Sequence, residues 1–291
     1  MKTSLSQQIT KQSGSNLALA FVLLPRAVRR DMTVLYAFCR EVDDIADESN
    51  LPVEERRARL NSWRKELDRL YQGQEAQTPL GRELASIIHT HGLRREWFEE
   101  LLHGVEMDLD HTRYPDRQSL DLYCFRVASV VGLLSLPIFG ARDPSATDYA
   151  IHLGKALQLT NILRDVAVDA QRDRIYLPQE DCRRFGVTEQ DILQGRYSDA
   201  YRQLAESIAQ WAIEHYRQAA RLLPASDLRV LIAAELMGTI YWQLLRKLQR
   251  RRFNVFATSP IRLTKLQKAG WIFLCWFRNR LGLQKPLYGA T

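Results

Sequence analysis

The sequence predicts an all-α protein that folds as one domain, a helical bundle around a central cavity. Apolar residues recur at three- and four-residue spacing along most of the chain, and no segment shows sustained period-two alternation between turn signals. Two predicted helices, RVASVVGLLSLPIFG (126–140) and LIAAELMGTIYW (231–242), are apolar nearly all round, as is expected of helices buried on both sides. No linker divides the 291 residues, so all of 1–291 is assigned to a single domain.

Proline positions and periodicity place the helices in order along the chain. Pro25 and Pro52 open helices over 25–48 and 52–71, and Pro79 lies near the start of one over 78–92, because proline suits the first turn of a helix. Periodicity predicts further helices over 94–109, 116–140, 144–172, 199–222, 227–252 and 262–283. Residues 1–12 are expected to be flexible, and 263–291 to hold a C-terminal helix.

Small residues interrupt the most apolar of these helices. They are Ala128, Ser129, Gly132, Ala233, Ala234 and Gly238. Such residues allow either close packing of two helices or an open cavity between them, and the sequence alone does not choose between the two.

Composition and charge narrow the class of partner. Hydrophobic residues make up 46% and charged residues 26% of the chain, which is typical of a globular protein. The net charge of +7 favours anionic partners such as phosphates, nucleic acid or acidic lipid headgroups. The run Arg250-Arg251-Arg252 suggests a nucleic-acid-binding alternative, but no recognition motif accompanies it, so no nucleic-acid partner is expected.

Cysteine usage and the chain ends predict a cytoplasmic protein. Cys39, Cys124, Cys182 and Cys275 form no Cys-x-x-Cys pair, so neither a zinc site nor a disulfide framework is indicated, and Cys39 and Cys124 are assigned to the core. The polar N-terminus lacks the apolar core of a signal peptide. The longest apolar run, 269–277, is about half of a membrane span, so no transmembrane helix is predicted. The segment GWIFLCWFRNR around it is either a core helix or an interfacial helix at the inner face of a membrane.

The stretch REVDDIADE (40–48) concentrates carboxylates on two helical turns. Asp43 and Asp47 are four residues apart and share one face, with Asp44 beside them. Like charges at this spacing repel each other unless a cation lies among them. Mg²⁺ takes a few carboxylates and completes its octahedron with water and phosphate oxygens. A solvated acidic helix end is the alternative.

A second polar stripe lies in QLTNILRDVAVD (158–169). Asn161, Asp165 and Asp169 follow each other at four-residue spacing on one helix face, and Gln158 continues the stripe. Carboxylates that are buried without partners are costly, and a neutral Asn among them lowers the repulsion while keeping an oxygen ligand. Two such stripes can face each other across a cavity.

Arginines accompany both stripes. Arg40 precedes Asp44 by one turn, Arg164 adjoins Asp165, and Arg172 and Arg174 follow. Guanidinium forks bind phosphate oxygens in pairs. Two oxygen-rich clusters, arginines and an apolar cavity suggest an apolar substrate that carries a diphosphate and ionises with the help of Mg²⁺. The resulting carbocation needs water excluded and aromatic walls.

The motifs LYAFCREVDDIADE (35–48) and QLTNILRDVAVDAQRDRIYLPQED (158–181) resemble those of the squalene and phytoene synthases, which join two prenyl diphosphates head to head. The resemblance extends from about Ser13 to about Leu266. The first motif is most similar to the bacterial presqualene diphosphate synthases of hopanoid biosynthesis, and RIYLPQEDCRRFGVTEQDI (174–192) is also similar to phytoene synthases.

The resemblance implies an isoprenoid-synthase-like fold and a role for each motif residue. Asp43, Asp44 and Asp47 would bind Mg²⁺ for one diphosphate, and Asn161, Asp165 and Asp169 for the other. The implied catalytic residues are Asp43, Asp47, Asp165, Asp169 and Tyr123, which lines the reaction centre. The implied substrate-binding residues are Arg40, Arg164, Tyr36, Gln158, Tyr176, Tyr241 and Arg262.

The activity that the resemblance implies is condensation of two farnesyl diphosphates to presqualene diphosphate. Mg²⁺ is the expected cofactor, with Mn²⁺ as a substitute, and NADPH is not expected to be needed for this first step. Phytoene synthesis from geranylgeranyl diphosphate and full, NADPH-dependent squalene synthesis are the alternatives. Expected partners are the prenyl diphosphates, a membrane surface and downstream isoprenoid enzymes.

Two features do not fit the family or suggest another class. Leu17 stands where the family usually has an aromatic residue, and it offers no π face to a carbocation. Glu100-Leu101-Leu102-His103 matches one Glu-x-x-His pair of a di-iron carboxylate bundle, but that class needs two such pairs and two more glutamates.

Overall fold

Helices make up most of the chain that the computed structural model describes, which is residues 4–13, 20–48, 50–257, 261–283 and 285–290. Within these ranges the sheet-like pairing is a single bridge between Arg113 and Ile175. The all-α prediction is therefore confirmed. In chain order the elements are α1 (Leu5–Ser13), η1 (Phe21–Leu23), α3 (Arg26–Asp47), α4 (Val53–Tyr71), α5 (Pro79–His91), α6 (Arg95–Asp110), α7 (Arg117–Cys124), η2 (Phe125–Ser129), α8 (Val130–Phe139), α9 (Ser145–Ala170), α10 (Gln179–Phe185), α11 (Glu189–Leu193), α12 (Asp199–Leu222), η3 (Ala225–Asp227), α13 (Ile232–Arg250) and α14 (Lys265–Arg280).

The predicted helices agree with the observed ones except at a few ends. The helix expected over 227–252 begins at Ile232, because the short 3-10 turn η3 and a turn at 228–231 precede it. Periodicity also missed α1, α10 and α11, which are too short for a clear pattern. α1 packs against α3 and α5, and the flexibility expected for residues 1–12 stays a prediction.

The segment expected as one helix over 116–140 contains a π-helical turn. η2 joins α7 to α8 without a break, and it packs against α6 and α9. A Cβ atom on Gly154 of α9 would lie 2.5 Å from Cα of Ser129, so only glycine allows this approach. By length and apolar composition alone, 117–139 could cross a membrane, but half of the apolar window is buried inside the bundle. Its burial and packing are those of a core helix.

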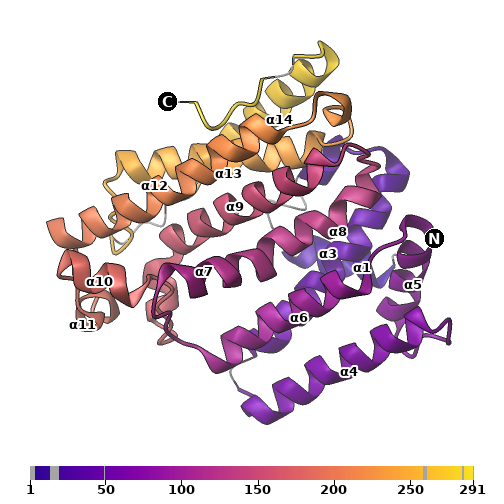
Figure 1. The fold of residues 1–291 in the computed structure, drawn as a ribbon, viewed down its shortest axis with the longest axis horizontal. Coiled ribbons are helices and arrows are strands. Elements are labelled where there is room, and N and C mark those ends of the chain that lie inside the picture. The colour runs from indigo at the N-terminus through magenta and orange to yellow at the C-terminus, as the bar shows by residue number, and fades with distance from the viewer. Residues whose placement is uncertain (1–3, 14–19, 49, 258–260, 284, 291) are drawn as a thin grey trace.

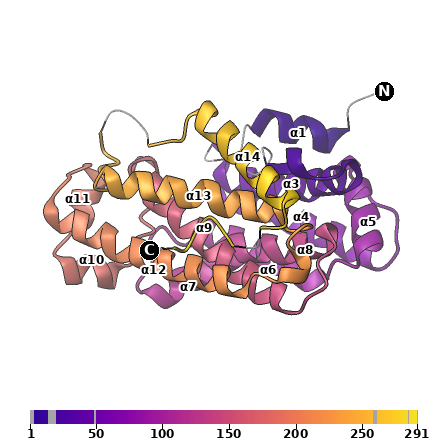
Figure 2. The same cartoon turned by 90° about the horizontal axis from the view of Figure 1, so that it is seen from above.

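α9 runs through the middle of the bundle, with α12 and α13 on one side and α8 on the other (Figure 1). α3 packs against α6 and α8, and its Arg40 and Asp43 line the same cavity as Gln158 and Asn161 of α9. α14 packs on α13 at the outside of the bundle, on the side where α1 also lies (Figure 2). Both motif helices therefore contribute to the walls of one central space.

A partly buried carboxyl group anchors the C-terminal residues to the bundle. Glu235 of α13 accepts a hydrogen bond of 2.8 Å from the Tyr149 hydroxyl of α9 and another from the Tyr288 hydroxyl. Burial raises the pKa of Glu235 to about 7, although both tyrosines and the charge of Arg278 favour the ionised form. The Cys275 thiol, whose pKa is raised by burial to about 11, is the other titratable group facing it. Glu235 is thus largely neutral below pH 7.

We expect this carboxyl to make stability depend on pH. The unfolded chain releases the proton near pH 4.5 and the folded chain near 7, so the stabilisation is full below the lower value and is lost as pH rises through the upper one. The shift corresponds to about 3 kcal/mol. Urea unfolding at about pH 5 and about pH 8 should show the wild type losing that stability relative to Glu235→Gln, which stays neutral. An equal difference between the two proteins at both pH values would contradict the assignment.

Candidate functional site

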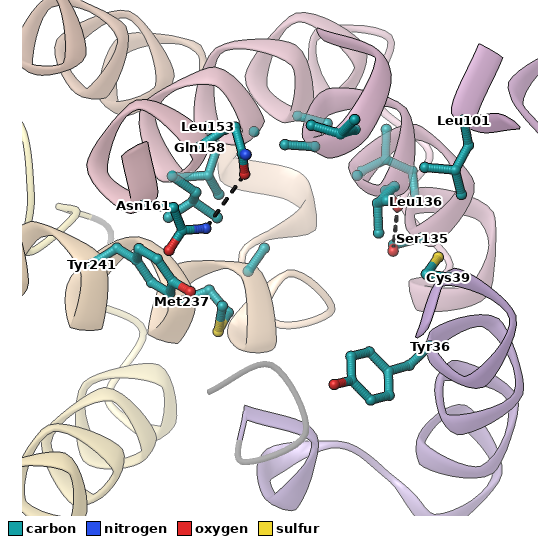
Figure 3. Close-up of a pocket in the computed structure, with 18 of the residues that line it drawn as sticks. Tyr36, Cys39, Leu101, Ser135, Leu136, Leu153, Gln158, Asn161, Met237 and Tyr241 are labelled. Carbon is teal, nitrogen blue, oxygen red and sulfur yellow. Dashed lines mark hydrogen bonds between the residues drawn. The ribbon is translucent and has the colours of Figure 1, made fainter. Parts of the chain in front are cut away.

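A cavity of about 360 Å³ lies between α3, α8, α9 and α13. Its walls are mostly apolar, with polar residues contributed from both the α3 side and the α9 side. Figure 3 shows Gln158, Asn161 and Tyr241 together on the α9 and α13 side, with the Tyr36 hydroxyl directed toward that space from α3. Of the predicted site residues, those that line the cavity are Tyr36, Arg40, Asp43, Tyr123, Gln158, Asn161 and Tyr241.

Some of the small residues line the cavity, and others allow close packing. Ala128, Gly132 and the pair Ala233 and Ala234 line the cavity. Ser129 and Gly238 instead allow close packing, since the Ser129 hydroxyl donates to the Ile151 carbonyl at 2.7 Å and the Tyr288 ring lies against Gly238. Cys124 is buried as expected, whereas Cys39 is half-buried and lines the cavity.

The first acidic motif is held by arginines from two parts of the chain. Arg40 donates to Asp43 at 3.0 Å and also to Asp44 on its own helix. Asp47 accepts from Arg174 at 2.9 Å and from Arg172 at 3.3 Å, both of which follow α9. These long-range ion pairs join the end of the second motif to the end of the first.

The second motif follows α9 on the opposite wall. Arg164 binds Asp165 with both arms of its fork, at 2.8 and 2.5 Å. The Asn161 amide donates to Gln158 at 3.4 Å, and the Oδ1 atom of Asn161 is buried with no hydrogen-bond partner. A buried acceptor that lacks a donor is unfavourable unless a ligand satisfies it. Asn161 is therefore suited to coordinate a cation.

Asp108, at the end of α6, lies between the two motifs. Its carboxylate accepts hydrogen bonds from the Tyr123 hydroxyl at 2.9 Å and from the Tyr176 hydroxyl at 2.7 Å. Tyr114 stacks on Tyr176 with ring centroids 5.6 Å apart, which fixes the position of the Tyr176 ring. Sequence reasoning missed Asp108 because it stands in neither stripe, and the one available signal was its place in MDLD before a turn.

Burial, and then the charges of neighbouring carboxylates, raises the pKa values of Asp43 and Asp169. The pKa of Asp43 is raised to about 6, by burial first and then by Asp47, and that of Asp169 to about 7, by burial and then by Asp165. The side chain of Asp43 is 52% exposed, because it faces the open cavity while protein surrounds the cavity itself. The charge of Asp108 raises both pKa values, which places it close to both motifs. The site therefore favours a bound cation.

The outer predicted residues lie beside the second motif. The Tyr241 hydroxyl interacts with Arg164, and Arg262 is exposed, with its carbonyl accepting from Lys247 at 2.6 Å. Lys268 of α14 was not predicted. Its pKa is lowered by burial and by the charges of Arg164 and Arg262. Lys268 therefore lies within electrostatic range of Arg164 and Arg262, and such cations suit a diphosphate.

The remaining sequence features lie apart from the cavity or outside the described residues. Leu17 lies outside the described residues. Glu100 pairs with Arg126 at 2.9 Å, and His103 lies near Glu99 on the same helix. Among the described residues, no hydrogen bond or ion pair joins Glu100 or His103 to the acidic motifs.

The oxygen donors present fit magnesium. Within the described part of the chain, no three Asp, Glu, His or Cys side chains converge closely enough to hold a metal by themselves. Instead, arginine side chains form ion pairs with the carboxylates of Asp43, Asp44, Asp47 and Asp165. Because Mg²⁺ keeps several waters and binds through one or two carboxylates plus substrate phosphates, a pre-formed cage is not required. The unpartnered Asn161 oxygen and the raised carboxyl pKa values support this fit.

Comparison with known proteins agrees with this geometry. The family model for squalene/phytoene synthase matches residues 10–267. The chain is 40% identical to a presqualene diphosphate synthase of Rhodopseudomonas palustris, over 88% of this chain and 90% of that protein. It is 33% identical to a 15-cis-phytoene synthase of Synechococcus elongatus, over 86% of this chain and 84% of that protein. A crystal structure of a dehydrosqualene synthase in complex with ligand is similar with a TM-score of 0.84 and 28% identity, covering 95% of each chain. The chain belongs to the squalene/phytoene synthase family.

Proposed function

We propose that this prenyltransferase condenses two molecules of farnesyl diphosphate head to head to presqualene diphosphate, with Mg²⁺ as cofactor. One observation carries the proposal: two acidic motifs with their own arginines face each other across Asp108 beside one apolar cavity. Two diphosphate sites at one cavity suit a reaction that joins two copies of the same kind of substrate. The greater identity to a presqualene diphosphate synthase than to a phytoene synthase supports the choice of product.

The motif residues would hold the metal and the two diphosphates. Asp43, Asp44 and Asp47 would bind Mg²⁺ at one diphosphate, and Asn161, Asp165 and Asp169 at the other. Bound Mg²⁺ would neutralise charge that develops on the leaving diphosphate. Arg40 and Arg164 would turn from their carboxylates toward phosphate oxygens, since a fork binds either partner in the same geometry. The apolar walls would keep water away from the allylic cation.

Tyr123 and Asp108 would take up the proton that the reaction releases. The carbon–oxygen bond to one diphosphate breaks, the double bond of the second farnesyl chain forms a new carbon–carbon bond, and loss of a proton closes the cyclopropane. Tyr123 stays neutral because burial holds its pKa well above the usual range. Its hydroxyl donates to Asp108, whose own pKa is raised by burial, so a proton accepted at the Tyr123 oxygen can pass to the Asp108 carboxylate. The departed diphosphate is the other acceptor.

Product analysis tests the proposal. Purified protein with farnesyl diphosphate and Mg²⁺ but no NADPH is expected to form presqualene diphosphate, identified by mass spectrometry, and to stop there. Without Mg²⁺, turnover should be lost. Phytoene from geranylgeranyl diphosphate with no turnover of farnesyl diphosphate would make the protein a phytoene synthase. Squalene formed only with NADPH would make it a full squalene synthase.

The proposal includes a place of action. The substrates and the product carry long apolar chains that partition into bilayers, so we propose a cytoplasmic enzyme in peripheral contact with the membrane through residues 263–291. Downstream isoprenoid enzymes would receive its product there.

A further inference from the structure

The end of the chain differs in charge from the rest. Residues 236–291 contain 11 of the 41 Lys and Arg residues and none of the 34 Asp and Glu residues, the last of which is Glu235. Residues 1–235 therefore carry 30 positive and 34 negative side chains, a formal charge of −4, against +11 for the C-terminal part. The basic character of the protein comes from this part alone.

Helix α14, in that basic part, turns an apolar face away from the bundle. Cys275 is buried, and Trp271 and Ile272 pack against the core. Leu266, Phe273 and Phe277 lie on the opposite side by helical spacing. Among the described residues, 12 large apolar side chains are exposed, and half of them lie in 266–283: Leu266, Phe273, Trp276, Phe277, Leu281 and Leu283. This concentration marks the helix as an interaction surface.

The exposed rings of α14 form one cluster with a basic edge. The ring centroid of Phe273 lies 6.1 Å from that of Trp276 and 6.2 Å from that of Phe277. The Arg280 guanidinium lies 5.6 Å from the centre of the Trp276 ring. Lys265 is exposed at the other end of the helix. Aromatic residues on one face with Lys and Arg at its border are typical of helices that lie in a membrane interface.

We propose that this surface, the outward face of α14 formed by Leu266, Phe273, Trp276, Phe277, Leu281 and Leu283, docks the protein on a bilayer of anionic lipid. The apolar side chains would enter the interface, and Lys265 and Arg280 at the two ends of α14 would contact headgroup phosphates. Anionic lipid is the partner that the charge favours, because the C-terminal part offers no carboxylate to repel it. This inference rests on the proposed peripheral contact with the membrane. It adds which surface of the protein makes that contact and which class of lipid it binds.

Docking through α14 would bring the cavity close to the lipid. α14 packs on α13, whose Met237 and Tyr241 line the cavity. The charge of Arg164 lowers the pKa of Lys268 of α14, so Lys268 lies within electrostatic range of the second motif. A substrate could therefore leave the bilayer tail-first into the apolar cavity while its diphosphate stays near Lys268 and Arg164.

Vesicle binding tests the proposal with the full chain. We expect the protein to sediment with vesicles of equimolar phosphatidylcholine and phosphatidylglycerol, to remain in solution with phosphatidylcholine alone, and to dissociate as salt rises. Phe273→Ser with Phe277→Ser should lower the partition coefficient at least about tenfold. Lys265→Glu with Arg280→Glu should lower it by a similar factor on the anionic vesicles. Both changes are at exposed positions, so folding should be retained.

Matched controls lie on another part of the surface. Leu193→Ser on α11 and Arg184→Glu on α10 change exposed residues away from α14, and they should leave binding unchanged. All variants should keep wild-type turnover of detergent-dispersed substrate, a readout that depends on the cavity and not on docking. Equal binding to neutral vesicles, binding unaffected by the α14 changes, or no binding by the wild type would overturn the proposal. A change of oligomeric state in Phe273→Ser without lipid would do so too, since the face would then join two copies of the chain.

Discussion

Asp43→Asn and Asp165→Asn are each expected to lower kcat by at least about 100-fold, because each removes a carboxylate that would hold Mg²⁺ against a leaving diphosphate. Stability should change little. The pKa of Asp43 is raised to about 6 by burial and by Asp47, so removing its charge relieves repulsion in the ligand-free protein. Steady-state kinetics with farnesyl diphosphate and Mg²⁺, with circular dichroism and a thermal melt of each variant, measures both quantities.

A surface aspartate provides the control for these two variants. Asp199→Asn changes an exposed carboxylate that pairs with Arg202 at the start of α12, and it should leave kcat unaltered. Raising the Mg²⁺ concentration should restore part of the activity of Asp43→Asn if a metal ligand has been lost. Near-normal kcat in both motif variants would refute the metal-site assignment.

Arg164→Lys and Arg40→Lys are expected to lower kcat/KM for farnesyl diphosphate by roughly 10- to 100-fold, although the charge is kept. Arg164 holds both oxygens of Asp165 with one fork, and Arg40 bridges Asp43 and Asp44. A lysine ammonium cannot bridge two oxygens in that planar geometry. Each lysine variant would therefore position a diphosphate less well and leave a motif carboxylate less neutralised.

Arg202→Lys is the matched control for the arginine variants. Arg202 bridges Asp199 and Glu206 on the surface of α12, far along the chain from both motifs. The same loss of a fork there should have no effect on kinetics. If diphosphate kinetics are also unchanged in Arg40→Lys and Arg164→Lys, both arginines have only a structural role.

The local content of the two motifs could be predicted without the structure. Four-residue spacing places Asp43 with Asp47, and Asn161 with Asp165 and Asp169, whatever the rest of the chain does, because helical geometry depends only on neighbouring residues. The same periodicity predicted all the long helices and located most of their ends correctly. The fold class and the two oxygen-rich stripes follow from such short-range patterns.

Contacts between distant segments were decided only by the tertiary structure. Asp108 lies between the two motifs because α6 ends beside the segment that follows α9, and there it meets Tyr123 and Tyr176. Arg174 reaches Asp47 across 127 positions of sequence. No periodic pattern encodes such pairs, since they depend on how whole helices pack against one another.

For α14 too, the sequence predicted the pattern of side chains on the helix, and tertiary packing decided which of them are exposed. The sequence alone determined an apolar, basic helix near the C-terminus and left a core helix and an interfacial helix as alternative interpretations. Packing decided only which side of the helix is exposed, because α13 covers the Cys275 side and leaves Phe273, Trp276 and Phe277 exposed. Helical periodicity determines which side chains share a face, whereas only the neighbouring helices determine which face is removed from water.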